Sequence, residues 1–287
     1  MNILGKRKLF YAISLAVIMA GMAGLVFNGG LNLGIDFKSG TIIEVDLKEP
    51  FTVDEIGQVL EPFAVGNSSI RAIGDAGTEA EIRTENLTEE KLTEVLAGLR
   101  SRWPEMENQI PATVDPLFSV ELVKQALLAL SVAAVGMVLY ISWRFEFKFA
   151  ISAIIALLHD VTIVLGFFAV FRVEVNSEFI AAILTIVGYS INDTIVVFDR
   201  IRENMKTAKR QGDIEGLANQ SVLQSIPRCL KTSVTTVLAI GAVLAFGGAT
   251  LKPLSTALVV GMIAGTYSSI FIASSLWLDL KRSSRRA

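Results

Sequence analysis

Six long apolar stretches constrain this chain more than any other feature of its sequence. A helix that spans a membrane needs about 20 mostly apolar residues, and six segments meet or approach that length. They are Leu9–Phe27, Leu122–Ile141, Phe149–Phe171, Phe179–Phe198, Ser233–Gly247 and Leu254–Leu276. Only 19% of the 287 residues are charged, compared with about 25% in soluble domains. The sequence therefore predicts an α-helical polytopic membrane protein with six transmembrane helices.

Lysine and arginine gather in alternate links between these stretches. Short cytoplasmic links carry an excess of both residues, which sets the orientation of a membrane protein. The basic segments are 1–8, the link holding Arg144 and Lys148, the segment 199–231, and the tail 278–287. The other short links hold only Arg172 and Lys252. This pattern predicts that both termini are cytoplasmic. The first stretch, 9–27, is longer than the 7–15 apolar residues of a signal peptide and no clear A-x-A cleavage site follows it, so we expect a retained anchor.

Residues 28–121 are polar and mixed, and the predicted topology places them outside the cytoplasm. Their periodicity predicts the order β-α-β-β-α-β, which is typical of a small ferredoxin-like α/β domain. Thr52 is the expected N-cap of the first helix in this region. The expected elements are strand Thr41–Leu47, helix Val53–Pro62, strands Ser69–Ile73 and Ala80–Thr84, helix Thr88–Arg100 and strand Gln109–Val114.

The rest of the chain, 122–277, holds the other five spans and the segment 199–231. Apolar residues recur at helical spacing among the charges of that segment, which predicts an amphipathic helix at the membrane interface. The net charge of −2 gives no signal for nucleic acid as a partner, and the single cysteine, Cys229, excludes an intrachain disulfide. Neither glycine-rich phosphate-binding motif is present, so use of ATP or a dinucleotide is not expected.

Two carboxylates inside the spans are the strongest functional signals. Insertion scales put an aspartate at a helix centre near +2.5–3.5 kcal/mol, so such a residue is a functional hypothesis by default. Asp193 lies in the fourth span with Tyr189 and Asn192 on a neighbouring polar stripe. That stripe predicts a hydrated seam and a proton relay. The alternative is a structural hydrogen-bonding seam between helices.

Asp160 lies near the middle of the third span beside His159, the only histidine. It is a second candidate for the proton relay, with a polar contact that orients the helix as the alternative. Because adjacent helical residues point about 100° apart, we expect no simple pair between His159 and Asp160. For His159 we favour the structural role. Arg228 opens the fifth span and could hold Asp193 as an ion pair. Its alternative is an ordinary cytoplasmic anchor.

Several motifs resemble the SecD/SecF family of the RND superfamily, and its SecF branch in particular. The most specific runs from Gly188-Tyr189-Ser190-Ile191-Asn192-Asp193-Thr194 into Val197-Phe198-Asp199-Arg200-Ile201-Arg202-Glu203-Asn204. The others are Gly34-Ile35-Asp36-Phe37, Ala156-Leu157-Leu158-His159-Asp160-Val161, Thr232-Ser233-Val234-Thr235-Thr236 and Gly265-Thr266-Tyr267-Ser268-Ser269-Ile270. The chain departs from the family pattern at Lys38-Ser39 and at Asp115 and Ser119.

The resemblance implies a subunit that pairs with SecD as a heterodimer and associates with the SecYEG translocon. With SecD it would use the proton motive force to promote export of unfolded polypeptides across the bacterial cytoplasmic membrane. It implies no enzyme activity, no metal and no cofactor, with membrane lipid as the surroundings. In the family, an essential arginine matches Arg228. Two other readings stay open: a self-contained RND-type exporter of a substrate or lipid, and a scaffold or sensor with an external binding domain.

Overall fold

The chain forms two compact units, a helical unit and an α/β unit. The structure is a computed structural model. It describes residues 2–38, 40–63, 65, 68–73, 77–108, 111–114, 116–207, 213–248 and 251–286. The helical unit holds the chain up to Asn32, Leu127–Gly247, and the chain from Leu251 onwards, whereas the α/β unit is built mainly from Leu33–Ala126.

Six helical runs in the described residues are long and apolar enough to cross a membrane, which confirms the six predicted spans. The sixth run has three parts that follow one another directly, because a stretch of π-helix lies between two α-helices. The runs are α1 (Arg7–Phe27), α5 (Pro116–Arg144), α6 (Phe147–Phe171), α7 (Ser177–Thr207), α8 (Ile214–Phe246), and α9 (Lys252–Tyr267) with η4 (Ser268–Ala273) and α10 (Ser274–Arg286). The short elements η1 (Leu4–Lys6), β1 (Asn32–Leu33) and β7 (Glu174–Val175) flank them.

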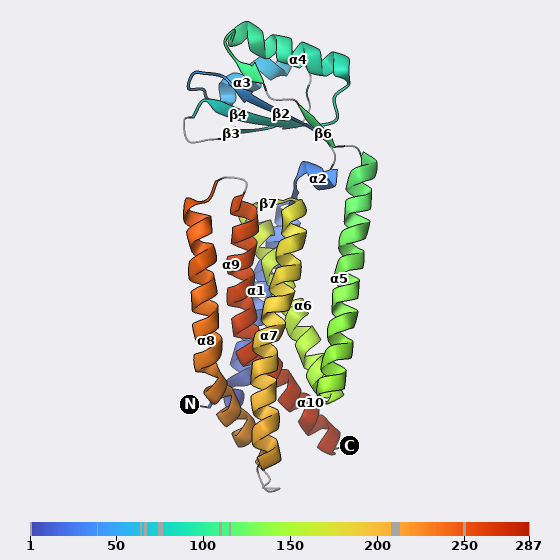
Figure 1. The fold of residues 1–287 in the computed structure, drawn as a ribbon, viewed down its shortest axis with the longest axis vertical. Helices are drawn as coiled ribbons and strands as arrows, with labels where there is room; N and C mark the ends of the chain where they lie inside the picture. The colour runs from blue at the N-terminus through green and yellow to red at the C-terminus, as the bar shows by residue number, and fades with distance from the viewer. Residues whose placement is uncertain are drawn as a thin grey trace. The chain divides into compact units, whose positions relative to one another are not determined.

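Small residues set how closely these helices approach. A Cβ atom added to Gly21 on α1 would lie 2.7 Å from the backbone of Gly166 on α6. One added to Gly265 on α9 would lie 2.9 Å from Ser190 on α7, and Gly261 lies against Ile186 in the same way. The Gly261-x-x-x-Gly265 pattern is therefore a helix-packing contact. Figure 1 shows α7, α8 and α9 running next to one another, as their contacts require.

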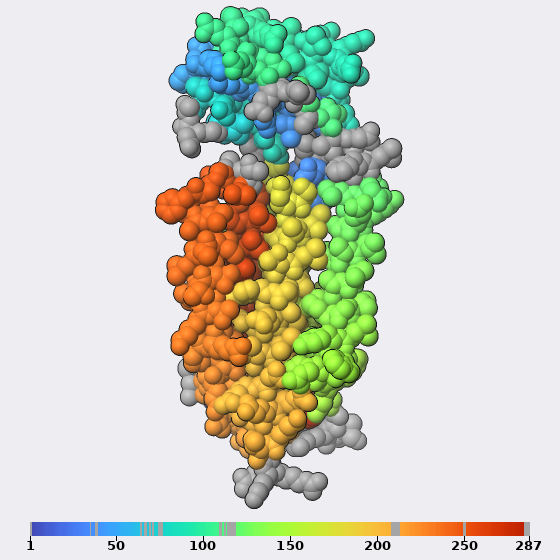
Figure 2. Space-filling view, viewed as in Figure 1, coloured from blue at the N-terminus to red at the C-terminus, as the bar shows by residue number. Residues whose placement is uncertain are grey.

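Apolar side chains cover the outside of the helical unit. On α5 the exposed apolar side chains include Leu127, Leu128, Val132, Val135 and Leu139. In Figure 2, α7 lies between α5 and α8 on the visible face. A cleft of about 380 Å³ lies between α5 and α7, and its lining includes Gly136 and Tyr140 of α5 and Gly188 of α7. A protein in water would not expose so much apolar surface, so lipid is the environment that this surface fits.

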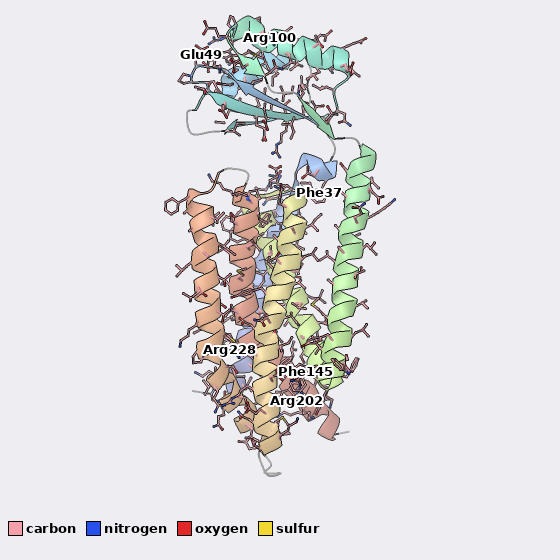
Figure 3. The ribbon with its side chains drawn as sticks, in the orientation of Figure 1. Phe37, Glu49, Arg100, Phe145, Arg202 and Arg228 are labelled. Atoms are coloured by element: carbon pink, nitrogen blue, oxygen red, sulfur yellow. The ribbon has the colours of Figure 1, made fainter. Side chains whose placement is uncertain are left out.

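The basic segments share one end of the helical unit. Arg7 pairs with Asp279 at 2.8 Å, Lys281 pairs with Glu146 at 2.6 Å, and Arg144 pairs with Asp199 at 3.3 Å. The N- and C-terminal segments therefore lie at the end that also holds the α5–α6 and α7–α8 links (Figure 1). In Figure 3 the Arg202 side chain lies by Phe145, and its guanidinium is 5.7 Å from the ring centre. This agrees with the predicted alternation of basic links.

The segment 199–231 differs from its prediction. No separate interfacial helix forms over its described residues, because its first half continues α7 to Thr207 and its second half begins α8 at Ile214. The apolar residues at helical spacing are buried against the helical core: Ala218 and Val222 are fully buried there. Packing between two extended helices takes up the amphipathic face that would otherwise meet the membrane interface.

The α/β unit has the predicted order of elements. Its antiparallel sheet runs β3-β4-β2-β5, with β6 also paired to β2, and this is the strand order of a split βαβ unit. Its core includes Ile43, Ile56, Ile82, Leu99 and Trp103. The elements are α2 (Ile35–Lys38), β2 (Gly40–Asp46), α3 (Val53–Leu60), η2 (Glu61–Phe63), β3 (Ser69–Ile73), β4 (Glu79–Thr84), α4 (Glu89–Arg102), β5 (Glu107–Asn108) and β6 (Ala112–Val114).

Thr52 caps α3, as predicted. Its hydroxyl accepts a hydrogen bond from the Glu55 backbone N–H, and the Glu55 carboxylate accepts one from the Thr52 backbone N–H at 2.8 Å. This reciprocal pair is a capping box. Of the predicted last strand, Gln109–Val114, the described part contains β6, and the short strand β5 precedes its predicted start. Its residues Gln109 and Ile110 lie outside the described residues, as do Ser39 and Asp115, two of the departures from the family pattern.

Candidate functional site

Asp160 lies in the middle of the helical unit and is fully buried. Two hydroxyl groups donate to its Oδ2 atom: Ser190 of α7 at 2.6 Å and Ser268 of η4 at 2.8 Å. The other carboxylate oxygen, Oδ1, lies 3.0 Å from Nδ1 of His159. A buried carboxylate is tolerated when its lone pairs are satisfied in this way. Three helical runs, α6, α7 and η4, therefore meet at one acid.

His159 contacts Asp160 directly, so the expectation that the two would not pair is wrong. The two side chains leave the helix in directions about 100° apart. The Nδ1 atom of the imidazole, which is the ring nitrogen nearer the backbone, nevertheless reaches the neighbouring carboxylate. The distal Nε2 lies 3.0 Å from the hydroxyl of Ser14 on α1, and the ring stacks on Tyr267 with centroids 6.1 Å apart. His159 therefore links α1 to the Asp160 cluster.

A second set of hydroxyl contacts joins η4 to α7. Ser269 donates to the backbone carbonyl of Ser190 at 3.2 Å, and its hydroxyl lies 2.7 Å from that of Thr194. Ser269 and Thr194 are buried. Because Ser190 also donates to Asp160, the two sets of contacts share one residue. The hydrogen-bonded groups thus extend from Ser14 on α1 to Thr194 on α7.

Asp193 is the second buried carboxylate, with 2% of its surface exposed. Its Oδ2 accepts a hydrogen bond from Ser233 of α8 at 3.3 Å. The Ser233 hydroxyl also lies 2.5 Å from that of Thr266 on α9. Asp193 therefore lies at the junction of α7, α8 and α9, the seam that the sequence predicts for it, but with a single long hydrogen bond.

The predicted ion pair between Asp193 and Arg228 is not formed. No ion pair within 4 Å is found for Arg228 among the described residues, and its side chain is exposed on α8. Figure 3 shows Arg228 in the half of α8 that is nearer the basic end. Arg228 can therefore reach the acid only after a change of side-chain conformation or helix position.

The polar stripe of α7 divides between two faces. Tyr189 is half-buried and donates to Thr236 of α8 at 3.4 Å. Asn192 is exposed and, in the part of the chain that the structure describes, forms no hydrogen bond. The buried side of α7 instead presents Ser190, Asp193 and Thr194. Of the five predicted relay residues, the structure thus groups Asp160 and Asp193 with buried hydroxyls and leaves Arg228 and Asn192 on the outside.

The hydroxyl residues of the other helices were not singled out from the sequence as site residues. They are Ser14, Ser233, Thr266, Ser268 and Ser269. The Thr-Tyr-Ser-Ser run in the sixth span is a local signal, because polar residues inside a span face protein rather than lipid. No group of three His, Cys, Asp or Glu side chains that could hold a metal ion is found in the described residues.

Chemically, the arrangement can take up, hold and release protons. The cluster combines two carboxylates and one imidazole with hydroxyls that both donate and accept. The Ser14 hydroxyl does stand beside a base, because it lies 3.0 Å from Nε2 of His159. Ser14, His159 and Asp160 are all buried, so this arrangement is not open to a substrate in the manner of an acyl- or phosphoryl-transfer site. Proton uptake coupled to helix packing is the chemistry that fits these groups.

Comparisons with known proteins agree with this picture. The family described as "Protein export membrane protein SecD/SecF, C-terminal" matches residues 95–283, and the "SecD/SecF GG Motif" matches residues 24–50. The chain is 38% identical over 292 residues to the protein translocase subunit SecF of Calditerrivibrio nitroreducens, covering 99% of this chain and 95% of that protein. It is 39% identical to SecF of Dictyoglomus turgidum, covering 98% of each chain.

Longer relatives carry the same region as one part. The protein translocase subunit SecDF of Bacillus subtilis is 39% identical over a match of 281 positions, and the match covers 96% of this chain and 37% of that protein. The crystal structure of SecDF from Thermus thermophilus, described as a translocon-associated membrane protein, superposes with a TM-score of 0.85 at 33% identity. The match covers 98% of this chain and 39% of that one. The chain thus spans less than half the length of these relatives.

Proposed function

The chain belongs to the SecD/SecF family of protein export membrane proteins, and from that premise we propose that it is a translocase subunit that uses the proton gradient to promote protein export. It acts with SecD, as a separate chain, and with the SecYEG channel. The substrate is an unfolded polypeptide on which no covalent chemistry is performed. The basic end of the helical unit faces the cytoplasm, and the α/β unit faces the opposite side.

The observation that carries this proposal is the burial of two carboxylates among hydroxyl groups of different helices. Asp160 binds hydroxyls from α7 and η4, whereas Asp193 binds one from α8. Adding a proton to either carboxylate removes its charge and weakens these hydrogen bonds, because bonds to a charged acceptor are roughly twice as strong as neutral ones. The packing of the helices therefore depends on where protons are bound.

The energy available is sufficient for such a role. One elementary charge that crosses the membrane potential releases about 2.3 kcal/mol per 100 mV. That is comparable to the cost of one buried carboxylate in a span and to the few kcal/mol that separate two conformations of a protein. A proton that moves through Asp193 can therefore shift α7, α8 and α9 between two arrangements, with Arg228 as the charged group that approaches in one of them.

The direct test is Asp193→Asn in the chain reconstituted with SecD and SecYEG. We expect assembly with SecD to persist and the stimulation of export by the proton gradient to fall to the level measured with the gradient collapsed. The matched control is Asp199→Asn, which changes a half-buried carboxylate six residues further along α7 that pairs with Arg144. Full stimulation in Asp193→Asn would overturn the relay, and an equal loss in both variants would assign the effect to the fold.

The same preparation separates this proposal from a self-contained exporter. The chain alone in liposomes should give no gradient-driven flux of a candidate lipid or small substrate, and stimulation should require SecD. Flux from the chain alone would support the self-contained RND-type exporter. If export is undiminished in a variant that lacks both Asp160 and Asp193, the chain would instead act as a scaffold.

A further inference from the structure

The hydroxyl of Ser268 has two acceptors within reach. It lies 2.8 Å from Oδ2 of Asp160 and 3.1 Å from the backbone carbonyl of Gly265, one turn earlier in its own helical run. A serine hydroxyl carries a single hydrogen, so Ser268 donates to one of these acceptors at a time. The residue is fully buried, and water therefore does not compete for that hydrogen.

The helical run changes type at the same point. Ser268 is the first residue of the π-helix η4, which follows α9 without a break. In the π-helix, Ser268 and Ser269 are both fully buried, and they contact two different helices, α6 and α7. Single turns of π-helix are rare and are frequently found at functional sites. Here the turn brings two adjacent hydroxyls to the Asp160 cluster.

We propose that Ser268 is a positioning residue of the Asp160 site, whose hydroxyl turns from the carboxylate to the Gly265 carbonyl when Asp160 takes up a proton. The inference rests on the proposed proton-coupled function and adds the residue through which the sixth span responds to that proton. The ionised carboxylate is the stronger acceptor, because its bonds are charge-assisted. After protonation the carbonyl of Gly265 competes on equal terms, and one link between α6 and the sixth span is lost.

The proton balance is simple. Asp160 gains one O–H bond with a proton taken from the aqueous phase, and the only other changes are in hydrogen bonds. Proton uptake on Oδ2 places a hydrogen where the Ser268 hydroxyl had donated, whereas uptake on Oδ1 removes the negative charge that attracted it. Both routes favour the turn of Ser268 towards Gly265.

Other titratable groups surround the cluster, and one of them contacts the carboxylate. That group is His159 of α6, whose Nδ1 lies 3.0 Å from Oδ1. Tyr267 of α9 donates to the Phe10 carbonyl instead. On α7, Asp193 binds Ser233, and on α8, Arg228 is exposed. On α1, Tyr11 donates to Asp279. Among the described residues, Ser190 and Ser268 are therefore the hydroxyls that report the charge of Asp160.

The test follows the carboxyl stretching band of Asp160 by infrared difference spectroscopy as a function of pH. The purified chain with SecD is used, and Asp160→Asn identifies the band. We expect Ser268→Ala to move the midpoint of the band towards higher pH by about one unit, a tenfold change in proton affinity. Ser268→Thr, which keeps the hydroxyl, should return the midpoint towards that of the unchanged protein.

Ser274→Ala is the matched control. Ser274 is also fully buried, and its hydroxyl donates to the Ile270 carbonyl of its own helical run, so it loses the same group without touching Asp160. Equal midpoints in Ser268→Ala and Ser274→Ala would overturn the proposal. So would the absence of any band that Asp160→Asn removes. The measurement needs no export, so a shifted midpoint together with unaffected export in Asp193→Asn would refute the proposed function and leave this inference standing.

Discussion

At the scale of single residues, the two buried acids differ in how well they are satisfied. Asp160 has three polar neighbours, His159, Ser190 and Ser268, whereas Asp193 has the one hydroxyl of Ser233. An unsatisfied buried charge costs more than the hydrogen bond it lacks. Asp193 is thus the acid that gains more from the approach of a cation, and Arg228 on the adjacent α8 is the cation that we propose for this role.

Arg228→Ala should separate function from folding. The side chain is exposed and forms no ion pair in the described residues, so the free energy of unfolding should change by less than about 0.5 kcal/mol. Stimulation of export by the proton gradient should nevertheless be lost, because no cation can then approach Asp193. Thermal unfolding in detergent and the export assay are the two measurements. The control is Lys231→Ala, which removes an exposed cation three residues further along α8 and should lower neither the free energy of unfolding nor the stimulation of export. Equal export in the two variants would show that Arg228 is an ordinary cytoplasmic anchor.

At the scale of elements, apolar length predicted the spans but not where their helices end. The fourth span was expected to end at Phe198 and α7 continues to Thr207, while α8 begins 19 residues before the predicted Ser233. Hydropathy records which residues suit lipid, whereas a helix continues as long as its backbone bonds and packing allow. The end of α7 packs on the start of α8, which also contacts α10. These contacts between distant segments stabilise both helices beyond the apolar stretch.

The contact between α7 and α9 depends on Gly265. A methyl group there would come within 2.9 Å of Ser190, the residue that donates to Asp160. We expect Gly265→Ala to force the two helices apart and to lower the free energy of unfolding by about 1–3 kcal/mol, the usual cost of overpacking. Gly241→Ala on α8 meets open space and should stabilise, because alanine is the better helix former. Thermal unfolding of the two variants measures the difference, and a neutral Gly265→Ala would show that α9 can shift freely.

The capping box of α3 makes the start of that helix sensitive to pH. The hydrogen bond from the Thr52 backbone N–H, followed by that of the Thr52 side chain, lowers the pKa of Glu55 below its ordinary value. A lowered pKa in the folded state stabilises the helix fully above the ordinary pKa of about 4.3, and the contribution is lost as the pH falls through the lowered value. Hydrogen exchange of Val53–Leu60, corrected for intrinsic rates, should therefore accelerate in acid.

Thr52→Ala is the corresponding variant, and it should weaken the start of α3 by about 1 kcal/mol at neutral pH. Thr93→Ala removes an exposed hydroxyl that donates within α4 and should leave α3 unchanged. Acid-independent exchange in the unchanged protein would contradict the role given to Glu55.

At the scale of the whole molecule, charge sets the orientation. The basic links gather at one end of the helical unit through ion pairs such as Arg7–Asp279 and Lys281–Glu146, and lysine and arginine favour the cytoplasmic side. The α/β unit follows α1 in the chain. One predicted crossing separates it from the N-terminus and five separate it from the C-terminus, so both termini are predicted on the other side of the membrane. The proposal therefore places Glu94 of α4 outside the cytoplasm and Gln220 of α8 inside it.

This orientation can be checked with single cysteines. In a Cys229→Ser background, Glu94→Cys should react with a membrane-impermeant maleimide added outside intact cells from which any outer barrier has been removed. Gln220→Cys should react only after the membrane is permeabilised. Both positions are exposed, so burial does not explain a difference. Labelling of Gln220→Cys in intact cells would show that the orientation is the opposite of the proposed one, with the start of α8 outside the cytoplasm.

Local patterns in the sequence were enough for the six spans, the β-α-β-β-α-β order, the Thr52 cap and the placement of Asp160 and Asp193 inside the spans. Each of these depends on neighbours within a few residues, such as apolar length, periodicity or a charge in an apolar run. The partners of the acids came from the folded chain: Ser14, Ser233 and Ser268 lie on other helices, and Asn192 turned out to face outwards. Contacts of this kind depend on the rotation of each helix and on close approaches at glycines such as Gly265. The sequence of a single helix determines neither, because both are set by packing against the other helices.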